Sequence, residues 1–243
     1  MSLYFGQYGQ DSVIDSFFQE IGRSTGTFLD VGASDGIRFS NSYFLEVNRG
    51  WKGICVEAHP DYFELLKKNR QTSINYGVAV GNKDGADVDI RLNYRASLTS
   101  LDLSIDEAFS NNYQDYYAPR EISEVNGFRN GIQKVKMRTI DSIIEENIET
   151  IPSFDVIMID IDGSEKFALS GFNLGKWKPR VLLIEHSVVG HNFVDSFANA
   201  FGYKYCITLG SDNFYVQNDH DLEIIKKIVP SKNFANVKHP AEM

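Results

Sequence analysis

The chain has 243 residues, 42% hydrophobic and 23% charged, with a formal net charge of −9 at pH 7. We expect a single globular domain over residues 1–243, and the acidic balance without a basic stripe disfavours nucleic acid as a partner. No apolar run approaches the roughly 18 residues that cross a bilayer, and the sequence shows no signal peptide. The two cysteines, Cys55 and Cys206, lie in apolar runs that predict buried free thiols. These features predict a cytoplasmic protein without a membrane span.

Strands and helices alternate along most of the chain. Apolar residues at helical spacing, with glycine, proline or a capping residue at the ends, predict helices over 12–21, 42–49, 60–66, 140–148, 164–172 and 193–201. Asp11 and Asn41 are the expected N-caps of the first two helices. Short apolar runs predict strands over 27–31, 53–57, 74–80, 88–92, 135–137, 154–160, 181–185, 203–209 and 214–216.

This alternation specifies an α/β fold with a doubly wound, mostly parallel sheet. The last two strands flank a Gly-Ser-Asp-Asn turn at 210–213, which predicts a C-terminal antiparallel hairpin. Residues 93–131 interrupt the pattern and are rich in tyrosine, so we expect an inserted lobe or lid there. Its tyrosines could stack on a sugar or an aromatic acceptor, or form the lobe's own small core.

A glycine-bearing turn follows the first predicted strand, in the segment FLDVGASDG at 28–36. Gly32 and Gly36 let a ligand approach the backbone, because glycine has no Cβ. The second strand ends at Glu57, and an acid at that position can accept hydrogen bonds from ribose hydroxyls. The two strands therefore predict a nucleoside cofactor, bound outside the carboxyl ends of the sheet.

The spacing of the glycines distinguishes two cofactors. A dinucleotide fingerprint reads G-x-G-x-x-G, whereas Ser34 stands here in place of the second glycine, which leaves the pyrophosphate cradle incomplete. S-adenosylmethionine has no phosphate, and backbone groups together with Ser34 can bind its amino-acid tail. S-adenosylmethionine is therefore the favoured cofactor, with a nicotinamide-dependent oxidoreductase as the alternative.

The chain resembles the FkbM family of class I S-adenosylmethionine-dependent methyltransferases, whose fold is Rossmann-like. The resemblance is carried by the segments YGQD at 8–11, FLDVGASDG at 28–36, SNS at 40–42, GWKGICVE at 50–57, RTID at 138–141, IDIDGSE at 159–165 and VLLIE at 181–185. These segments cover most of the chain, from about residue 8 to 216, with a gap at the tyrosine-rich lobe. One departure is Asp162, at a position where the family commonly has Glu.

The resemblance implies a set of cofactor-binding residues. Those expected to shape the turn are Asp30, Gly32, Ala33, Ser34 and Gly36. Glu57 would bind the ribose, and Ala58 and Ala79 would lie near the adenine. Asp160 ends a predicted strand, so from its position we also expect it to contact the cofactor or the acceptor. The resemblance also implies methyl transfer to a hydroxyl oxygen of a sugar or other secondary metabolite.

Carboxylates and a histidine after the later strands are the candidates for catalysis. An acceptor hydroxyl needs a general base or a metal to remove its proton, and Asp160, Asp162 and His186 are the expected catalytic residues. Asp160 and Asp162 would point the same way in extended backbone, so they must share a proton, bind a cation or contact separate partners. Asp160, Asp162 and Glu185 are the candidate ligands of Mg²⁺, and Glu165 is expected to cap the next helix.

The sequence therefore predicts an S-adenosylmethionine-dependent O-methyltransferase acting on a small-molecule or glycan acceptor. Besides the nicotinamide-dependent enzyme, the alternative is a module that binds S-adenosylmethionine without turnover.

Overall fold

The computed structural model of the chain describes residues 4–92 and 131–231. The lobe predicted at 93–131 lies outside these ranges except for its last residue, so its form and role stay predictions, as does a single domain over 1–243. Among the described residues, no helix combines the length and the apolar character needed to cross a membrane.

A seven-stranded sheet forms the centre of the molecule, in the order β3-β2-β1-β7-β8-β10-β9. Its strands are β1 (Thr27–Val31), β2 (Lys52–Val56), β3 (Ile74–Tyr76), β7 (Val156–Ile159), β8 (Val181–Glu185), β9 (Lys204–Leu209) and β10 (Asp212–Val216). All neighbouring pairs from β3 to β8 are parallel, whereas β10 is antiparallel to both β8 and β9. The predicted doubly wound, mostly parallel sheet with a C-terminal hairpin is therefore confirmed.

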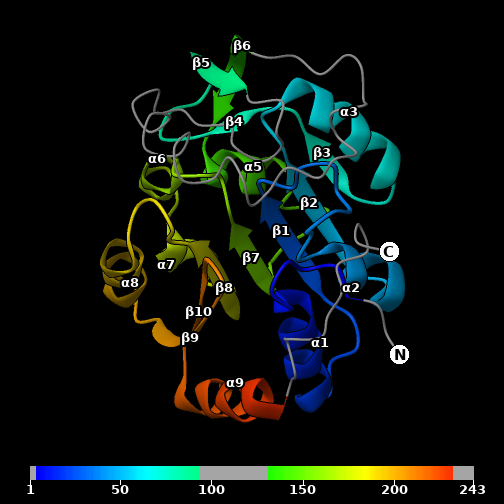
Figure 1. Cartoon of the computed structure of the whole chain (residues 1–243), viewed down its shortest axis with the longest axis vertical. Coiled ribbons are helices and arrows are strands. Elements are labelled where there is room, and N and C mark those ends of the chain that lie inside the picture. The colour runs from blue at the N-terminus through cyan, green and yellow to red at the C-terminus, as the bar shows by residue number, and fades with distance from the viewer. Residues whose placement is uncertain (1–3, 93–130, 232–243) are drawn as a thin grey trace, which may run out of the picture.

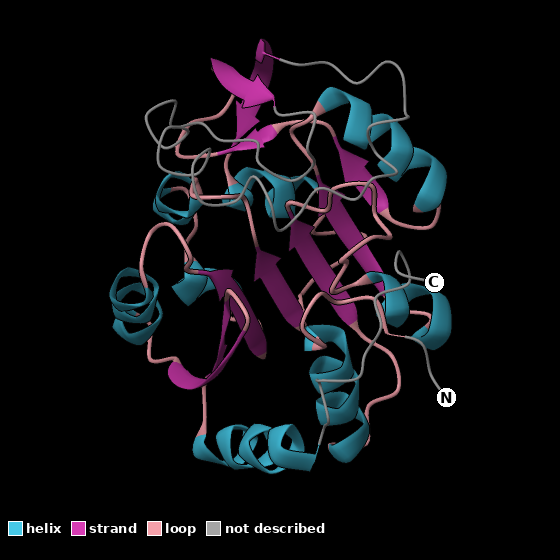
Figure 2. Ribbon diagram, in the orientation of Figure 1, coloured by secondary structure: helices cyan, strands magenta, loops and turns pink. Residues whose placement is uncertain are grey.

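Helices cover both faces of this sheet (Figure 2). They are α1 (Gln10–Glu20), α2 (Tyr43–Arg49), α3 (Pro60–Asn69), α5 (Ile140–Glu146), α6 (Glu165–Ser170), α7 (Leu174–Trp177), α8 (His191–Ala200) and α9 (Asp219–Ser231). Alternate strand residues point to opposite faces. In β1, Leu29 and Val31 pack into the core that contains α5, α6, α7 and α8. Phe28 packs into the core that contains α1, α2, α3 and α9.

A second sheet of three strands lies beyond the carboxyl ends of the central strands, as Figure 1 shows. It consists of β4 (Ala79–Val80), β6 (Gly131–Arg138) and β5 (Asp87–Leu92). The sequence had predicted one strand over 74–80. The structure divides it into β3 and β4, which belong to different sheets. The chain leaves the central sheet at Gly77, where a Cβ would lie 2.6 Å from the ring of Phe63.

The strand order places a topological switch point between β1 and β7. The chain winds outward from β1 to β3 and then returns to place β7 on the other side of β1. The loops that leave β1 and β7 lead to α2 and α6 on opposite faces of the sheet, and ligands of such sheets bind at this kind of point. Asp30 is near the end of β1 and Asp160 follows β7 directly, so the predicted site residues lie at this point.

Candidate functional site

The turn after β1 is closed by backbone hydrogen bonds. The amide of Gly36 donates to the carbonyl of Ala33 over 2.9 Å, and the amides of Gly32 and Ala33 donate to Val56 at the end of β2. Gly32 has φ +95°, and a Cβ there would lie 1.7 Å from the carbonyl oxygen of Asp160. Glycine is thus required where β1 and β7 approach each other. Ser34 adopts φ 50°, a left-handed conformation usually left to glycine.

Glu57 joins the turn after β1 to the turn after β2. One carboxylate oxygen accepts from the amide of Ser34 over 2.8 Å, and the other accepts from the amide of His59 over 2.7 Å. Burial raises the pKa of Glu57 to about 7, although these backbone hydrogen bonds favour the ionised form. Two amides therefore fix the orientation of the carboxylate that the sequence assigned to a ribose.

The two alanines predicted beside an adenine lie together. Ala79 is buried in β4, and Ala58 packs against the small apolar cluster that Ala79 forms with Ile90. This cluster belongs to the second sheet, so Ala79 is not at the end of a central strand as the sequence analysis assumed. Both alanines nevertheless border the turn that holds Glu57, since Ala58 follows it in the chain.

The loop after β7 places three carboxyl groups close together. Asp160, Asp162 and Glu185 each offer one oxygen, and these oxygens all lie within 4.8 Å of one another. The expectation of extended backbone is wrong for Asp162, which has φ 51° and precedes Gly163 at φ 95°. The side chains of Asp160 and Asp162 therefore converge through a left-handed turn rather than through the alternation of a strand.

Burial and mutual repulsion perturb all three groups. Loss of hydration, followed by the charge of Glu185, raises the pKa of Asp160 and of Asp162 well above the usual value. Burial also raises the pKa of Glu185 to about 8. Glu185 also accepts a hydrogen bond from the hydroxyl of Ser187. The three carboxyl groups therefore keep protons at pH values at which an exposed carboxyl group has lost its own.

Glu165 lies against the inner side of the loop that follows β7. It is fully buried, and its Oε1 accepts from the amides of Ile161 and Gly163 over 3.0 and 3.2 Å. These amides belong to the loop before α6, so Glu165 fixes the loop rather than serving as the N-cap, which is Ser164. Burial raises the pKa of Glu165 to about 7.

Asp212 is a site residue that the sequence analysis missed. The sequence predicts a turn at Asp212, but the structure makes it the first residue of β10, paired with Glu185 of β8. Burial, followed by the charge of Asp160, raises its pKa well above the usual value. Gln10 at the start of α1 donates to Asp212 over 2.6 Å. The segment YGQD at 8–11 therefore reaches the acidic cluster through Gln10, a contact between residues 202 positions apart.

The two histidines after β8 have different surroundings. His186 follows Glu185, and its amide donates to the carbonyl of Ser211 over 2.9 Å. Burial, followed by the charge of His191, lowers the pKa of His186, which keeps its imidazole neutral near pH 7. His191 begins α8 and lies 2.9 Å from the side-chain amide of Asn213. Of the two, His186 is the one next to the carboxyl cluster in the chain.

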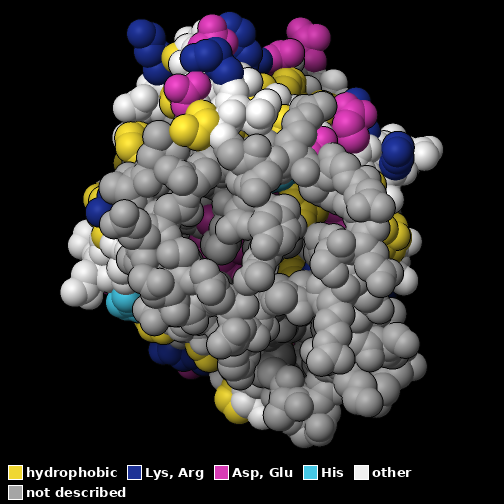
Figure 3. All heavy atoms as spheres, turned by 45° about the horizontal axis from the view of Figure 1, so that its top comes forward, with side chains coloured by type: hydrophobic (Ala, Val, Ile, Leu, Met, Phe, Trp, Pro, Cys, Tyr) yellow, Lys and Arg dark blue, Asp and Glu magenta, His cyan; other side chains and the backbone are white. Residues whose placement is uncertain are grey.

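Figure 3 turns this end of the molecule toward the viewer. Asp and Glu side chains and hydrophobic side chains are both visible in the middle of this face, whereas Lys and Arg side chains gather with Asp and Glu side chains at the tip formed by the second sheet. At that tip Lys134 pairs with Asp89 and Lys136 with Asp87, and all four are exposed.

A doubly wound sheet with a glycine turn and an acid at its switch point is typical of nucleoside-binding α/β folds. The Methyltransferase FkbM domain matches residues 30–205, which is most of the chain. The chain therefore belongs to the FkbM methyltransferase family, and the resemblance seen in the sequence is confirmed.

Comparison with other proteins adds neighbours of low identity. The structure of methyltransferase FkbM from Methylobacillus flagellatus KT is 16% identical with a TM-score of 0.47, and the match covers 79% of this chain and 44% of that one. The chain thus spans less than half the length of that protein. A TehB-like SAM-dependent methyltransferase from Corynebacterium glutamicum is 12% identical with a TM-score of 0.42, over 87% of this chain and 89% of that one. No curated protein matches.

Proposed function

We propose that this protein is an S-adenosylmethionine-dependent O-methyltransferase that acts on a hydroxyl of a small acceptor, either a glycan or a secondary metabolite. Family membership supports methyl transfer. The observation that carries the choice of cofactor is the hydrogen bond from Ser34 to Glu57, which makes the glycine turn and the ribose-binding acid one unit. The acidic cluster beside this unit supports a role in proton removal.

The residues present fit an adenosyl cofactor. A carboxylate has about four acceptor positions, and backbone amides use two of those on Glu57, which leaves two for ribose hydroxyls. Ala58 and Ala79 would offer an apolar surface to the adenine, while Asp30, Gly32, Ala33, Ser34 and Gly36 would shape the turn around the amino-acid tail. When bound, S-adenosylmethionine supplies an electrophilic methyl group on a sulfonium.

The chain's own residues would position the acceptor and remove its proton. Asp162, which lies with Asp160 and Glu185 in the cluster, would accept the proton from the acceptor hydroxyl. Its raised pKa makes it a stronger base than an exposed aspartate. His186 is the second candidate base, because its lowered pKa keeps it neutral and able to accept a proton.

A divalent cation is the other arrangement that the carboxyl cluster supports. Asp160, Asp162 and Glu185 supply the oxygen ligands that Mg²⁺ prefers. A proton shared within the cluster is the alternative to a metal, and a cation would displace it, because metal ligands must be deprotonated. Methyl transfer that persists in EDTA supports the shared proton, whereas loss with EDTA and recovery with Mg²⁺ supports the metal.

Substitution of Glu57 tests the cofactor assignment. Glu57→Gln removes the charge and should weaken S-adenosylmethionine binding about tenfold to a hundredfold, the range expected for a hydrogen bond to a charged group. Glu64→Gln, on the exposed side of α3, is the matched control and should leave affinity unchanged. Equal affinity in the wild type and Glu57→Gln would refute the role of Glu57.

The base is tested by transfer of a labelled methyl group onto extracts that contain hydroxylated acceptors. Asp162→Asn should reduce transfer about 100-fold to 10,000-fold with unchanged cofactor affinity, the usual contribution of a general base. If His186→Gln has this effect instead, His186 is the base. Cofactor binding without transfer to any acceptor would favour a binding module. Tight, saturable NADH binding would favour the nicotinamide-dependent enzyme.

A further inference from the structure

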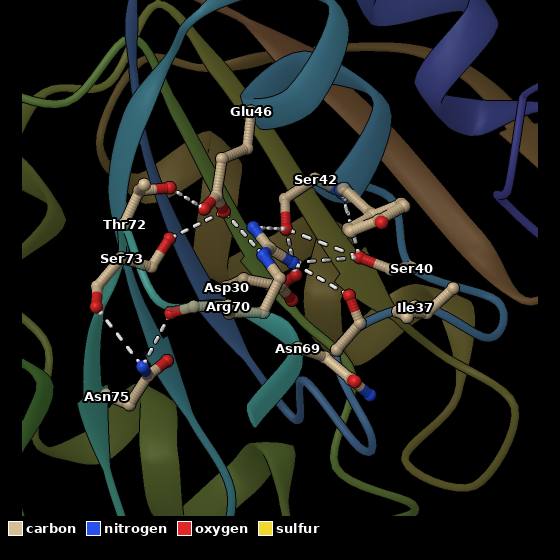
Figure 4. A network of polar contacts seen from close by, with 12 residues as sticks. Asp30, Ile37, Ser40, Ser42, Glu46, Asn69, Arg70, Thr72, Ser73 and Asn75 are labelled. Atoms are coloured by element: carbon tan, nitrogen blue, oxygen red, sulfur yellow. Dashed lines mark hydrogen bonds and ion pairs between the residues drawn. The ribbon is translucent and has the colours of Figure 1, made fainter. Parts of the chain in front are cut away.

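Arg70 is fully buried directly beneath the turn after β1, as Figure 4 shows. It follows α3 as the C-cap residue, and its guanidinium lies 5.3 Å from the ring of Phe28 and 5.6 Å from that of Tyr43. A buried cation costs hydration free energy unless charges and hydrogen bonds compensate it. The contacts of Arg70 therefore show what the fold gains from this residue.

One side of the guanidinium is neutralised by a buried acid. Nε of Arg70 pairs with Glu46 of α2, which is 8% exposed. The carboxylate of Glu46 also accepts from the hydroxyls of Thr72 and Ser73, the latter over 2.7 Å. Glu46 and its two hydroxyl partners form the anchor of Arg70, on the side away from the turn.

The other side of the guanidinium reaches the turn itself. Nη1 donates to the carbonyl of Gly36 over 3.1 Å, and Nη2 donates to the hydroxyl of Ser42 over 3.0 Å. That hydroxyl in turn donates to the carboxylate of Asp30 over 2.5 Å. The preceding residue, Asn69, donates to the carbonyl of Asp35 over 2.8 Å. The end of α3 therefore binds two consecutive carbonyls of the turn.

The packing around Gly36 also indicates that Arg70 supports the turn after β1. Gly36 has φ +82°, and a Cβ there would lie 2.6 Å from Cγ of Arg70 and 2.7 Å from Cδ1 of Leu66. This glycine is thus needed because the turn rests on the aliphatic stem of Arg70. The approach of a ligand, which the sequence predicts at Gly36, is therefore not needed to explain this glycine.

We propose that Arg70 is the positioning residue of the cofactor turn, acting directly on the carbonyl of Gly36 and through Ser42 on Asp30. Lysine cannot replace it, because only the planar fork of arginine reaches Glu46, Gly36 and Ser42 at once. The inference rests on the proposed function, since it assigns Arg70 to the binding of S-adenosylmethionine.

Two buried serines of the same network supply a matched test. Ser42→Ala removes the link between Arg70 and Asp30, whereas Ser73→Ala removes a hydroxyl that binds only the Glu46 end. Ser42→Ala and Arg70→Lys should each raise the Kd for S-adenosylmethionine and S-adenosylhomocysteine roughly tenfold by calorimetry, the loss expected for one hydrogen bond. Ser73→Ala should lower the melting temperature about as much as Ser42→Ala does, but it should leave the Kd unchanged.

Amide hydrogen exchange in the protein without cofactor supplies a readout that does not depend on binding. Exchange at residues 32–38 should be faster in Ser42→Ala and Arg70→Lys than in the wild type and Ser73→Ala. If Arg70→Lys does not fold, Ser42→Ala alone decides. Wild-type Kd in Ser42→Ala, or equal effects of the two serine variants, would overturn the inference. If the wild type binds neither compound, the proposed function fails, and exchange alone decides whether Arg70 orders the turn.

Discussion

Substitution of Gly32 by alanine should destabilise the protein far more than a glycine substitution in an open turn. Gly32 has φ +95°, and its added Cβ would lie 1.7 Å from the carbonyl oxygen of Asp160 and 2.8 Å from the carbonyl carbon. That backbone cannot yield easily, because the amide of Asp160 donates to the carbonyl of Val31 over 2.9 Å and aligns β7 with β1. Gly22 has φ +74° with no atom within 4 Å of its added Cβ, so it reports the cost of the backbone conformation alone.

The two costs can be separated. An alanine in a left-handed conformation costs about 1–2 kcal/mol, which is the loss of unfolding free energy expected for Gly22→Ala. Forcing β1 and β7 apart adds an overpacking cost of about 1–3 kcal/mol, so Gly32→Ala should lose about 2–5 kcal/mol. Urea unfolding followed by circular dichroism measures both. Equal losses in the two variants would refute the reasoning that Gly32 is fixed by the approach of β7.

Three further predictions concern protons, thiols and an ion pair. Burial raises the pKa of Glu57 to about 7 and that of Glu185 to about 8. Protons bound to these two groups therefore stabilise the folded protein fully below pH 4.5, and this stabilisation is lost as the pH rises through the two pKa values. The free energy of unfolding, from urea titrations without cofactor, should therefore fall between about pH 5 and 8, and a flat profile would contradict this. Burial also raises the pKa of Cys55 and Cys206 to about 12, so both thiols should react with a disulfide reagent only after unfolding; fast labelling of the native protein would contradict this. Asp221→Asn should cost about 1–3 kcal/mol of stability without changing cofactor affinity, because Asp221 is fully buried under two hydrogen bonds from Arg180; unchanged stability in urea unfolding would contradict it.

Local patterns predicted the central sheet well, since buried parallel strands appear as apolar runs. The predicted ends of helices and strands were wrong where contacts with distant residues determine them. Asp212 looked like a turn residue, yet pairing with Glu185 extends β10 to include it. The first helix begins after Gly9 in a left-handed conformation rather than at an Asp11 cap, because Asp11 accepts from the amide of Phe5. The helices α7 and α9 were missed, although Leu222, Ile225 and Ile228 follow helical spacing in α9.

The sequence predicted only part of the candidate site, because contacts between distant residues also determine which residues form it. Residues that follow strands, such as Glu57 and Asp160, could be placed because parallel strands end at one edge. The support beneath them could not be placed. Arg70 looks like an ordinary charged residue at a helix end, and nothing near it in the sequence indicates that Glu46, 24 positions earlier, is buried against it. Such a pair is determined by how α2 and α3 pack.

The most direct test is calorimetry with S-adenosylmethionine at pH 6 and pH 8, on the wild type and Glu57→Gln. The ribose hydroxyls require the ionised carboxylate, and burial raises the pKa of Glu57 to about 7. We predict saturable binding of one molecule per chain that is tighter at pH 8, with the pH dependence lost in Glu57→Gln. Absence of binding, or preferential binding of a dinucleotide at this site, would contradict the account.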